Sequence, residues 1–240
     1  MSKRRLAYSA ALVMAILGVA LMATITPAQA QTVFNLTSCH ISTGCPPAGT
    51  IFGTVTLTQS GGNVNFDVVL ADGNRFVETG AGGGGLFLFN DVVAGSTVTN
   101  ITTTLNGANV AIPGGLTGLT NQTGVNLIHA DGTGDFTAIV KCTTDASCNG
   151  GSTPNINDLH FTVTGATIAQ LDDANADGNI FVADILCGAG VSVCGGLTGP
   201  VDVSTPGTVV PEPTSLLMVG TALAGLGAAW RRRWSAKAAV

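Results

Sequence analysis

The sequence TIFGTVTLTQSGGNVNFDVVL, residues 50–70, decides the fold class. Polar and apolar residues alternate from Thr50 to Gln59 and again from Val64 to Leu70, which is the period of strands with one buried face. Between the two runs, residues 60–63 (SGGN) are typical of a tight hairpin turn. The stretch therefore predicts an antiparallel β-hairpin.

Similar short runs recur along the chain, and no stretch shows sustained helical periodicity. Glycine contributes 33 of 240 residues and aromatic residues only 5%, the profile of an all-β secreted domain. About nine or ten short strands are expected, and two packed sheets are the usual way to bury so many half-apolar faces. The sequence thus predicts an antiparallel β-sandwich, jelly-roll-like, over residues 31–205. Its further strands are expected at residues 75–78, 86–89, 96–105, 125–129, 135–142, 158–171 and 179–186.

The N-terminus has the parts of a secretory signal peptide. Basic residues at positions 3–5 precede an apolar run over residues 6–25, and residues 27–30 (PAQA) form a small-x-small site for signal peptidase. A signal helix in residues 1–30, removed to leave Gln31 as the mature N-terminus, is therefore expected. An uncleaved anchor helix is the alternative, disfavoured because a helix-breaking proline follows the apolar run.

The C-terminus, residues 206–240, carries a second apolar segment. Residues 214–230 hold no charge and are followed by three arginines, as in a transmembrane helix whose positive end stays inside. Leu216 to Trp230 would span about 22 Å as a helix, against a hydrocarbon core of roughly 30 Å. So short a helix favours a transient anchor over a permanent tail anchor, which is the alternative.

Residues 210–213 (VPEP) precede this apolar segment, and the arginines follow it. The order of these C-terminal parts resembles the PEP-CTERM sorting signal of Gram-negative bacteria. The resemblance implies that an exosortase, a membrane-embedded cysteine transpeptidase, recognises the Pro-Glu-Pro region, removes the helix and delivers the protein to the cell surface or extracellular matrix. Some proteins labelled ice-binding carry the same motif, and residues 52–90 also resemble the N-terminal half of many PEP-CTERM surface proteins. The motif residues are Val210, Pro211, Glu212, Pro213, Arg231, Arg232 and Arg233.

Six cysteines fall into three close pairs. An even number of cysteines in an exported chain favours disulfides, and pairing within each pair is expected because small loops close easily, although six cysteines allow fifteen connectivities. Zinc binding is the rival interpretation, but none of the pairs has the two-to-four-residue spacing of zinc ligands. The pairs are Cys39/Cys45, Cys142/Cys148 and Cys187/Cys194.

Charge restricts the partners of the mature domain. Between Gln31 and Val210 the only basic side chains are Arg75 and Lys141, whereas twelve Asp and Glu78 are acidic, so the net charge is 2 − 13 = −11. Nucleic acid is excluded as a partner because phosphate contacts need Lys/Arg clusters. Anionic polysaccharide would be repelled unless a divalent cation bridged it, which leaves neutral glycans, calcium and hydrophobic partners.

Residues 173–184 (DANADGNIFVAD) match the ligand spacing of an EF-hand loop, with Asp in the twelfth place as in dockerin modules. A Ca²⁺ ion is therefore a candidate cofactor. The alternative is a hairpin turn, since the flanking segments read as strands and an EF-hand needs helices. A calcium site in a β-loop would satisfy both. The candidate ligands are Asp173, Asn175, Asp177, Asn179 and Asp184.

Catalytic motifs are missing from the sequence: there is no G-x-S-x-G, no H-E-x-x-H and no glycine-rich loop followed by Lys. Asp131 and Asp135 are imaginable as a carboxylate pair for glycoside hydrolysis, but turn residues explain them more simply. A glycan-active enzyme would require Asp131, Asp135 or Asp158 to converge with a His in a cleft. We therefore expect a protein that is not an enzyme.

The expected function is that of an exported structural or adhesive protein of the exopolysaccharide or biofilm matrix, reached by way of an inner-membrane anchored intermediate. Thr/Asn-rich strand faces and acidic loops would present oxygen atoms to glycan or to calcium-bridged polymer. The alternative is a calcium-, glycan- or ice-binding surface module. Thr97, Thr99 and residues 102–104 are candidates for a flat threonine array, although a single threonine-rich strand is explained by β-propensity.

Overall fold

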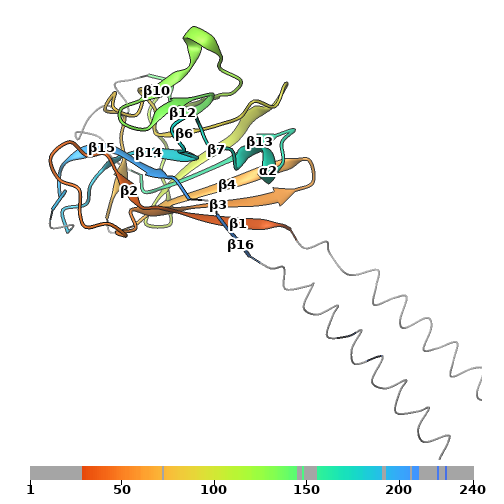
Figure 1. Cartoon of the computed structure of the whole chain (residues 1–240), viewed down its shortest axis with the longest axis horizontal. Coiled ribbons are helices and arrows are strands. Elements are labelled where there is room, and N and C mark those ends of the chain that lie inside the picture. Colours follow the sequence, from red (N-terminus) through yellow and green to blue (C-terminus); the bar gives the residue numbers. More distant parts are fainter. Residues whose placement is uncertain are drawn as a thin grey trace, which may run out of the picture. The chain divides into compact units, whose positions relative to one another are not determined.

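The computed structural model divides the chain into two compact units, residues 30–211 and a unit made of residues 1–29 and 212–240. The first unit is the β domain, coloured in Figure 1. No helix in the part of the chain that is described is long and apolar enough to cross a membrane. Apart from residues 29, 30, 221 and 225, the predicted signal helix, transmembrane helix and Pro-Glu-Pro and arginine residues lie outside that part. The described residues are 29–71, 73–144, 148, 156–190, 193–205, 207–210, 221 and 225.

The described strands are antiparallel throughout and form two large sheets and one small ribbon. Sheet A runs in the order β16 (Thr208–Val210), β1 (Gln31–Leu36), β3 (Gly53–Ser60), β4 (Asn63–Leu70), β13 (Asp158–Thr164), β7 (Thr97–Leu105), β8 (Ala108–Asn109). Sheet B runs in the order β2 (Ser38–Cys39), β15 (Thr198–Val203), β14 (Phe181–Leu186), β6 (Phe87–Phe89), β12 (Ala138–Cys142), β9 (Leu116–Leu119), and β5 (Arg75–Phe76) also pairs with β14. The ribbon consists of β10 (Ile128–Ala130) and β11 (Gly134–Phe136).

The hairpin predicted from residues 50–70 is present as β3 and β4. Ser60 pairs with Asn63 across a two-residue turn, and Gly61 has the positive φ of 59° that such turns require. Along β3 and β4 the side chains alternate between the core and the outer face. The prediction of an all-β, antiparallel fold is confirmed, and the jelly-roll-like connectivity stays a prediction.

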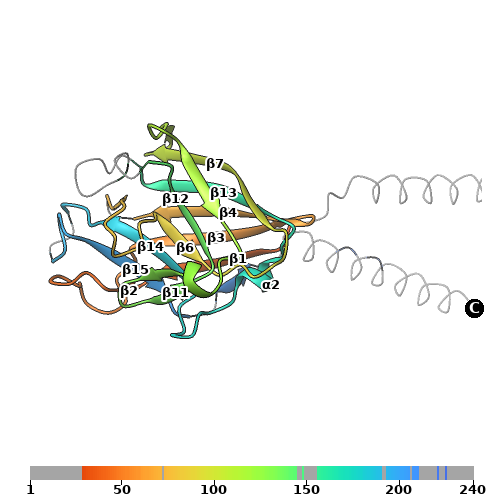
Figure 2. The same ribbon diagram turned by 90° about the horizontal axis from the view of Figure 1, so that it is seen from above.

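Aromatic rings join the two sheets in one hydrophobic core. Phe66 of sheet A stacks on Phe161 of the same sheet, with ring centroids 4.4 Å apart, and reaches Phe89 and Phe181 of sheet B at 5.2 and 5.9 Å. Phe66 is only 2% exposed. Figures 1 and 2 show the strands of the two sheets in two layers, and these rings fill the space between the layers.

Two predicted strands are divided in the structure, and both predictions were wrong in extent. Residues 135–142 break at Thr137, whose hydroxyl accepts a hydrogen bond from the Asp91 amide and whose carbonyl accepts one from Gln122. The chain therefore passes from the ribbon into sheet B at this residue. Residues 125–129 begin as a 3₁₀ turn, Gly124–Asn126, and only then enter β10.

The predicted strand over residues 158–171 ends at Thr164. Gly165 has a φ of 74°, which stops the extended run, and α2 (Ile168–Leu171) follows. The Gln170 side chain accepts a hydrogen bond from the Thr167 amide at 2.9 Å, half of a capping box that starts this helical turn. The β-branched residues of this stretch gave no sign of the helix.

The structure joins the same three cysteine pairs that their spacing favours. Cys39–Cys45 and Cys187–Cys194 have Cα atoms 5.7 Å apart, and Cys142–Cys148 has them 6.2 Å apart. Each bridge closes a short loop at the end of a strand of sheet B, namely β2, β12 or β14. None of the described cysteines is free.

Candidate functional site

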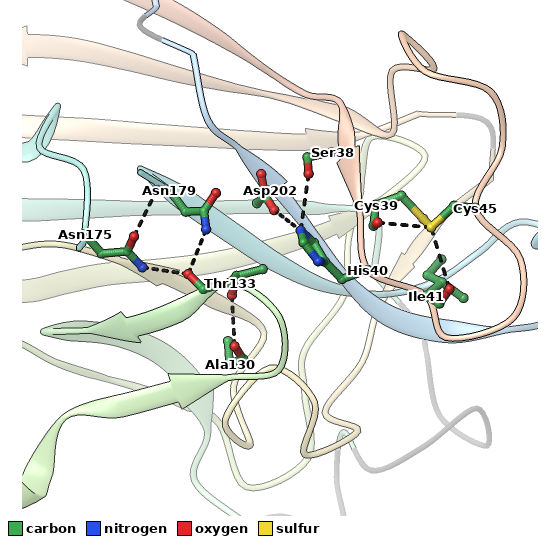
Figure 3. A network of polar contacts seen from close by, with 10 residues as sticks. All are labelled: Ser38, Cys39, His40, Ile41, Cys45, Ala130, Thr133, Asn175, Asn179 and Asp202. Atoms are coloured by element: carbon green, nitrogen blue, oxygen red, sulfur yellow. Dashed lines mark hydrogen bonds and ion pairs between the residues drawn. A yellow bond between two sulfur atoms is a disulfide. The ribbon is translucent and has the colours of Figure 1, made fainter. Parts of the chain in front are cut away.

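The loop over residues 173–180 closes on its own backbone (Figure 3). The Asn175 side-chain oxygen accepts hydrogen bonds from the amides of Asp177 and Asn179, at 3.1 and 2.9 Å. The backbone amide of Asn175 in turn donates to the backbone carbonyl of Asn179 at 2.8 Å. An Asn that satisfies neighbouring amides in this way is typical of a turn.

This loop is fastened to the turn of the β10–β11 ribbon. The side-chain amides of Asn175 and Asn179 both donate to the Thr133 carbonyl, at 2.7 and 2.8 Å. Gly134 follows with a φ of 88°, and a Cβ there would lie 2.3 Å from an Asp177 carboxylate oxygen. The positive φ favours glycine at this position, and a larger residue would also have to displace the Asp177 side chain. Figure 3 shows the contact of Asn175 and Asn179 with Thr133.

Asp184, the twelfth residue of the calcium-loop pattern, is fully buried, and its carboxylate accepts hydrogen bonds from a residue outside the loop. One carboxylate oxygen accepts hydrogen bonds from the amide and hydroxyl of Thr79, at 2.8 and 2.6 Å, and the other oxygen has no hydrogen-bond partner. Burial raises the pKa of Asp184 to about 6, against the opposing effect of the Thr79 hydrogen bonds. Asp184 is thus a buried carboxyl held by a neighbouring strand segment.

The structure brings Asn175, Asp177 and Asn179 together and turns Asp184 toward Thr79. The backbone carbonyl of Asp173 accepts a hydrogen bond from the Asn90 side-chain amide at 3.0 Å. Among the described residues, no group of three or more His, Cys, Asp or Glu side chains is arranged to hold a metal ion. The hydrogen bonds support the turn alternative, and the calcium site stays a prediction from the spacing.

Ser38, His40 and Asp202 form a cluster that the sequence did not indicate (Figure 3). The Nε2 atom of His40 lies 2.5 Å from an Asp202 carboxylate oxygen and 3.2 Å from the Ser38 hydroxyl. A nucleophilic triad needs the acid on one ring nitrogen and the hydroxyl on the other. Because both partners approach the same nitrogen, this cluster lacks the proton relay of a serine hydrolase.

Asp202 is fully buried, and burial raises its pKa, partly offset by His40. Its second oxygen has no hydrogen-bond partner. His40 and Asp202 are 162 residues apart, so only the pairing of β2 with β15 brings them together. The pair thus connects the segment that follows β2 to β15.

The carboxylates considered for glycoside hydrolysis lie on the β10–β11 ribbon. His129 Nδ1 is 2.9 Å from an Asp135 oxygen, and Nε2 is 3.8 Å from an Asp131 oxygen. All three side chains are more than half exposed, whereas a glycosidase acid needs a shielded site that raises its pKa. Asp158 lies on β13, where it accepts a hydrogen bond from Thr104 at 2.5 Å. Asp131 and Asp135 therefore meet His129 on an exposed surface, and Asp158 bonds to Thr104 on another sheet.

The outer face of sheet A carries a regular set of hydroxyl and amide groups. On β3, Thr54, Thr56 and Thr58 alternate with buried Val55 and Leu57. The strand pairings place Thr56 and Thr58 in rows with polar residues of β4, β13 and β7, since directly opposed residues share a face. The row of Thr54 also contains Val69 and Asp158 before it reaches Thr104, and the register of β13 on β7 shifts between His160 and Thr162. We call this set the threonine array: Thr54, Thr56, Thr58, Asn65, Asp67, Thr97, Thr99, Thr102, Thr104, His160, Thr162 and Thr164.

Hydrogen bonds tie neighbouring rows of the array together. The hydroxyls of Thr97 and Thr164 are 2.8 Å apart, and the Thr162 hydroxyl donates to Asn65 at 2.9 Å. The acidic residue of the set, Asp67, pairs with His160 at 3.0 Å. Strand geometry spaces the residues by about 4.8 Å across strands and about 6.8 Å along them, except at the irregularity of β7 between Thr99 and Thr102. The array is a polar lattice without Lys or Arg.

The segment that leads into the predicted sorting region belongs to the β domain. β16 pairs with β1 in the register Gln31 with Val210, Thr32 with Val209, and Val33 with Thr208. The residue expected at the mature N-terminus thus pairs with the last residue before Pro211. Sheet A ends at this strand.

Residues 209–233 match the PEP-CTERM protein-sorting motif. The chain carries a PEP-CTERM sorting signal. The resemblance drawn from the Pro-Glu-Pro and arginine residues is confirmed, and exosortase-dependent sorting of an exported protein through a membrane-anchored intermediate follows from the motif. No curated protein and no solved structure is significantly similar to the chain. The match covers about a tenth of the sequence. It identifies the sorting route of the protein and gives no information about the activity of the β domain.

Proposed function

We propose that this PEP-CTERM protein is delivered by an exosortase to the cell surface or extracellular matrix of a Gram-negative bacterium. There the β domain is a structural or adhesive component of exopolysaccharide or biofilm. The observation that carries the proposal is the sorting motif at residues 209–233. Signal peptidase releases residues 1–30, and the helix over residues 214–230 anchors the protein until the exosortase removes it. No catalytic step is assigned to the domain.

The threonine array is the surface that we assign to matrix contact. Its hydroxyl and amide groups match the hydroxyl groups of a neutral polysaccharide, and it holds no Lys or Arg that would select an anionic one. The array contains no Phe, Tyr or Trp, so each sugar contact is weak, and adhesion depends on many contacts made together. A seven-stranded sheet face offers the area for such multiple contacts.

The test compares cosedimentation of the protein with the host's own purified exopolysaccharide. Replacing Thr56, Thr102 and Thr162 by Val removes three hydroxyls from the centre of the array while keeping β-branched side chains. The matched control replaces Thr117 and Thr198, two half-buried threonines on sheet B, by Val. We expect a several-fold loss of binding for the array variant and none for the control. Equal binding of the array variant and the wild type would contradict the assignment.

The same array favours one alternative function, that of an ice-binding surface module. The sequence indicated a single threonine-rich strand, whereas the pairings align threonines from β3, β7 and β13. Thermal hysteresis of a protein solution separates the two functions. A freezing-point depression lost in the Thr56, Thr102 and Thr162 variant would favour ice binding, and its absence in the wild type favours the matrix role.

A further inference from the structure

Two residues belong both to the folded sheet and to the sorting signal. The matched motif begins at residue 209, and β16 extends from Thr208 to Val210. Val209 and Val210 are therefore paired with β1 at the same time as they form the start of the signal that the exosortase reads. The chain provides no linker between the sheet and Pro211.

β16 is held by one neighbour along three residues. Among the described strands it pairs with β1 alone, whereas β1 pairs with β3 along six residues. The Thr208 hydroxyl adds a hydrogen bond to the Val33 carbonyl at 3.3 Å. The strand lies at the end of sheet A, where it can leave without breaking any other described strand pairing. Such a short edge strand is the part of a sheet that opens most readily.

The approach to β16 is specialised for close contact with β1. A Cβ on Gly207 would lie 2.5 Å from a Thr32 methyl and 2.7 Å from the ring of Phe34. Glycine at this position lets the chain cross β1 and also leaves the backbone free to rotate when the contact is released. Residues 204–211 would then reach about 26 Å from Val203 in extended form.

A transpeptidase has to hold the residues around the cleaved bond in an extended conformation, and strand backbone groups are the usual means of recognition. The backbone amides and carbonyls of Val209 and Val210 that face β1 cannot bond to β1 and to an enzyme together. We propose that Thr208–Val210 is a substrate segment that leaves β1 and binds the exosortase. This proposal rests on the exosortase sorting proposed above. Detachment of β16 is then a required step of sorting.

The test locks β16 in place with a disulfide. Val33 of β1 lies directly opposite Thr208 of β16; Val33 is half-buried and Thr208 is exposed. The Cα atoms of directly opposed strand residues lie at a distance that a disulfide can bridge. The double variant Val33→Cys and Thr208→Cys is expressed in the native host as the full chain. The matched control, Thr58→Cys and Asn65→Cys, places a disulfide on the same outer face between β3 and β4. Intact-mass analysis reports the loss of residues 1–30 and of the C-terminal helix separately.

We expect the locked variant to lose its signal peptide normally. Its cleavage near Pro211 should be about ten-fold slower than in the wild type, because the disulfide removes the state in which β16 is detached from β1 and available to the exosortase. Each single-cysteine variant and the control disulfide are cleaved like the wild type. Cleavage of the locked variant at the wild-type rate would overturn the proposal and mean that the enzyme reads the motif with β16 in place. Failure of the wild type to be cleaved at all would instead refute exosortase sorting itself.

A rescue separates blocked recognition from damage to the protein. A flexible Gly/Ser linker followed by a second copy of Thr208–Val210 is inserted before Pro211 in the locked variant. The exosortase then has a free segment while the original β16 remains fixed. Restored cleavage supports the proposal, and cleavage that stays low despite normal signal-peptide removal contradicts it.

Discussion

Replacing Asp184 by Asn is expected to remove a pH dependence from the unfolding free energy of the β domain. Asp184 is fully buried, and burial raises its pKa from the ordinary 3.8 to about 6. The difference between these values corresponds to about 3 kcal/mol. Since the native state binds this proton more tightly than the unfolded state does, the stabilisation is complete below about pH 4 and is lost as the pH rises through 6.

The variant keeps an oxygen for the Thr79 amide and hydroxyl, and its NH₂ group takes the place of the carboxylate oxygen that has no partner. Burying this unsatisfied donor costs about 1–3 kcal/mol at every pH. The difference in unfolding free energy between variant and wild type should therefore shift by about 2 kcal/mol in favour of the variant between pH 4 and pH 7. Thr79→Val, which removes one hydrogen bond to the carboxylate, should move the transition to higher pH.

The assay is guanidinium unfolding of residues 31–211 with disulfides intact, at a series of pH values. Far-UV circular dichroism is the suitable signal, because Tyr8, Trp230 and Trp234 all lie outside this segment. Parallel pH profiles for wild type and Asp184→Asn would refute the reasoning. Repeating the series in calcium tests the loop: a stabilisation by calcium that disappears in the variant would mean that Asp184 is a ligand after all.

Three further predictions concern the same unfolding assay. Phe66→Ala should lower the unfolding free energy by about 4 kcal/mol, because it empties the junction of four other rings, whereas Phe66→Leu should cost about 1–2 kcal/mol; equal effects of the two would contradict the packing. Replacing Cys142 and Cys148 together by Ser should cost about 2 kcal/mol by loop entropy, and an unchanged midpoint would mean that the bridge adds nothing. Gly134→Ala should destabilise more than Gly61→Ala, since both have positive φ but only Gly134 faces the Asp177 carboxylate; the reverse order would refute the contact.

Features set by neighbouring residues could be predicted from the sequence. The β3–β4 hairpin follows from alternation and an SGGN turn, and the cysteine pairing follows from partners six or seven residues apart. The sorting motif could be recognised because its parts follow one another along the chain. In each case the physical cause is local.

Features set by strand order could not be predicted. The threonine array requires β13 to lie between β4 and β7, which brings Thr162 beside Asn65 from 97 residues away. The His40–Asp202 pair depends in the same way on β2 lying beside β15. Alternation marks which residues share a strand face and gives no information about which strand comes next in a sheet.

Some strands were missed because their own residues obscure the pattern. Gly199 and Pro200 interrupt the alternation of β15, although five of its six residues, Gly199 to Val203, are buried. β16 has only three residues and precedes a proline, so residues 206–210 were assigned to the sorting region. Pairing with β1, and not any propensity of its own, makes this segment a strand.

Intact-mass analysis of the protein from its native host tests the central claim most directly. Envelope and culture fluid are examined separately. Sorting by an exosortase predicts a species that starts at Gln31, ends near Pro211 to Thr214 and lies six mass units below the fully reduced value, because three disulfides remove six hydrogens. A species that retains Trp230 to Val240 in both fractions would contradict sorting and leave an ordinary anchored envelope protein.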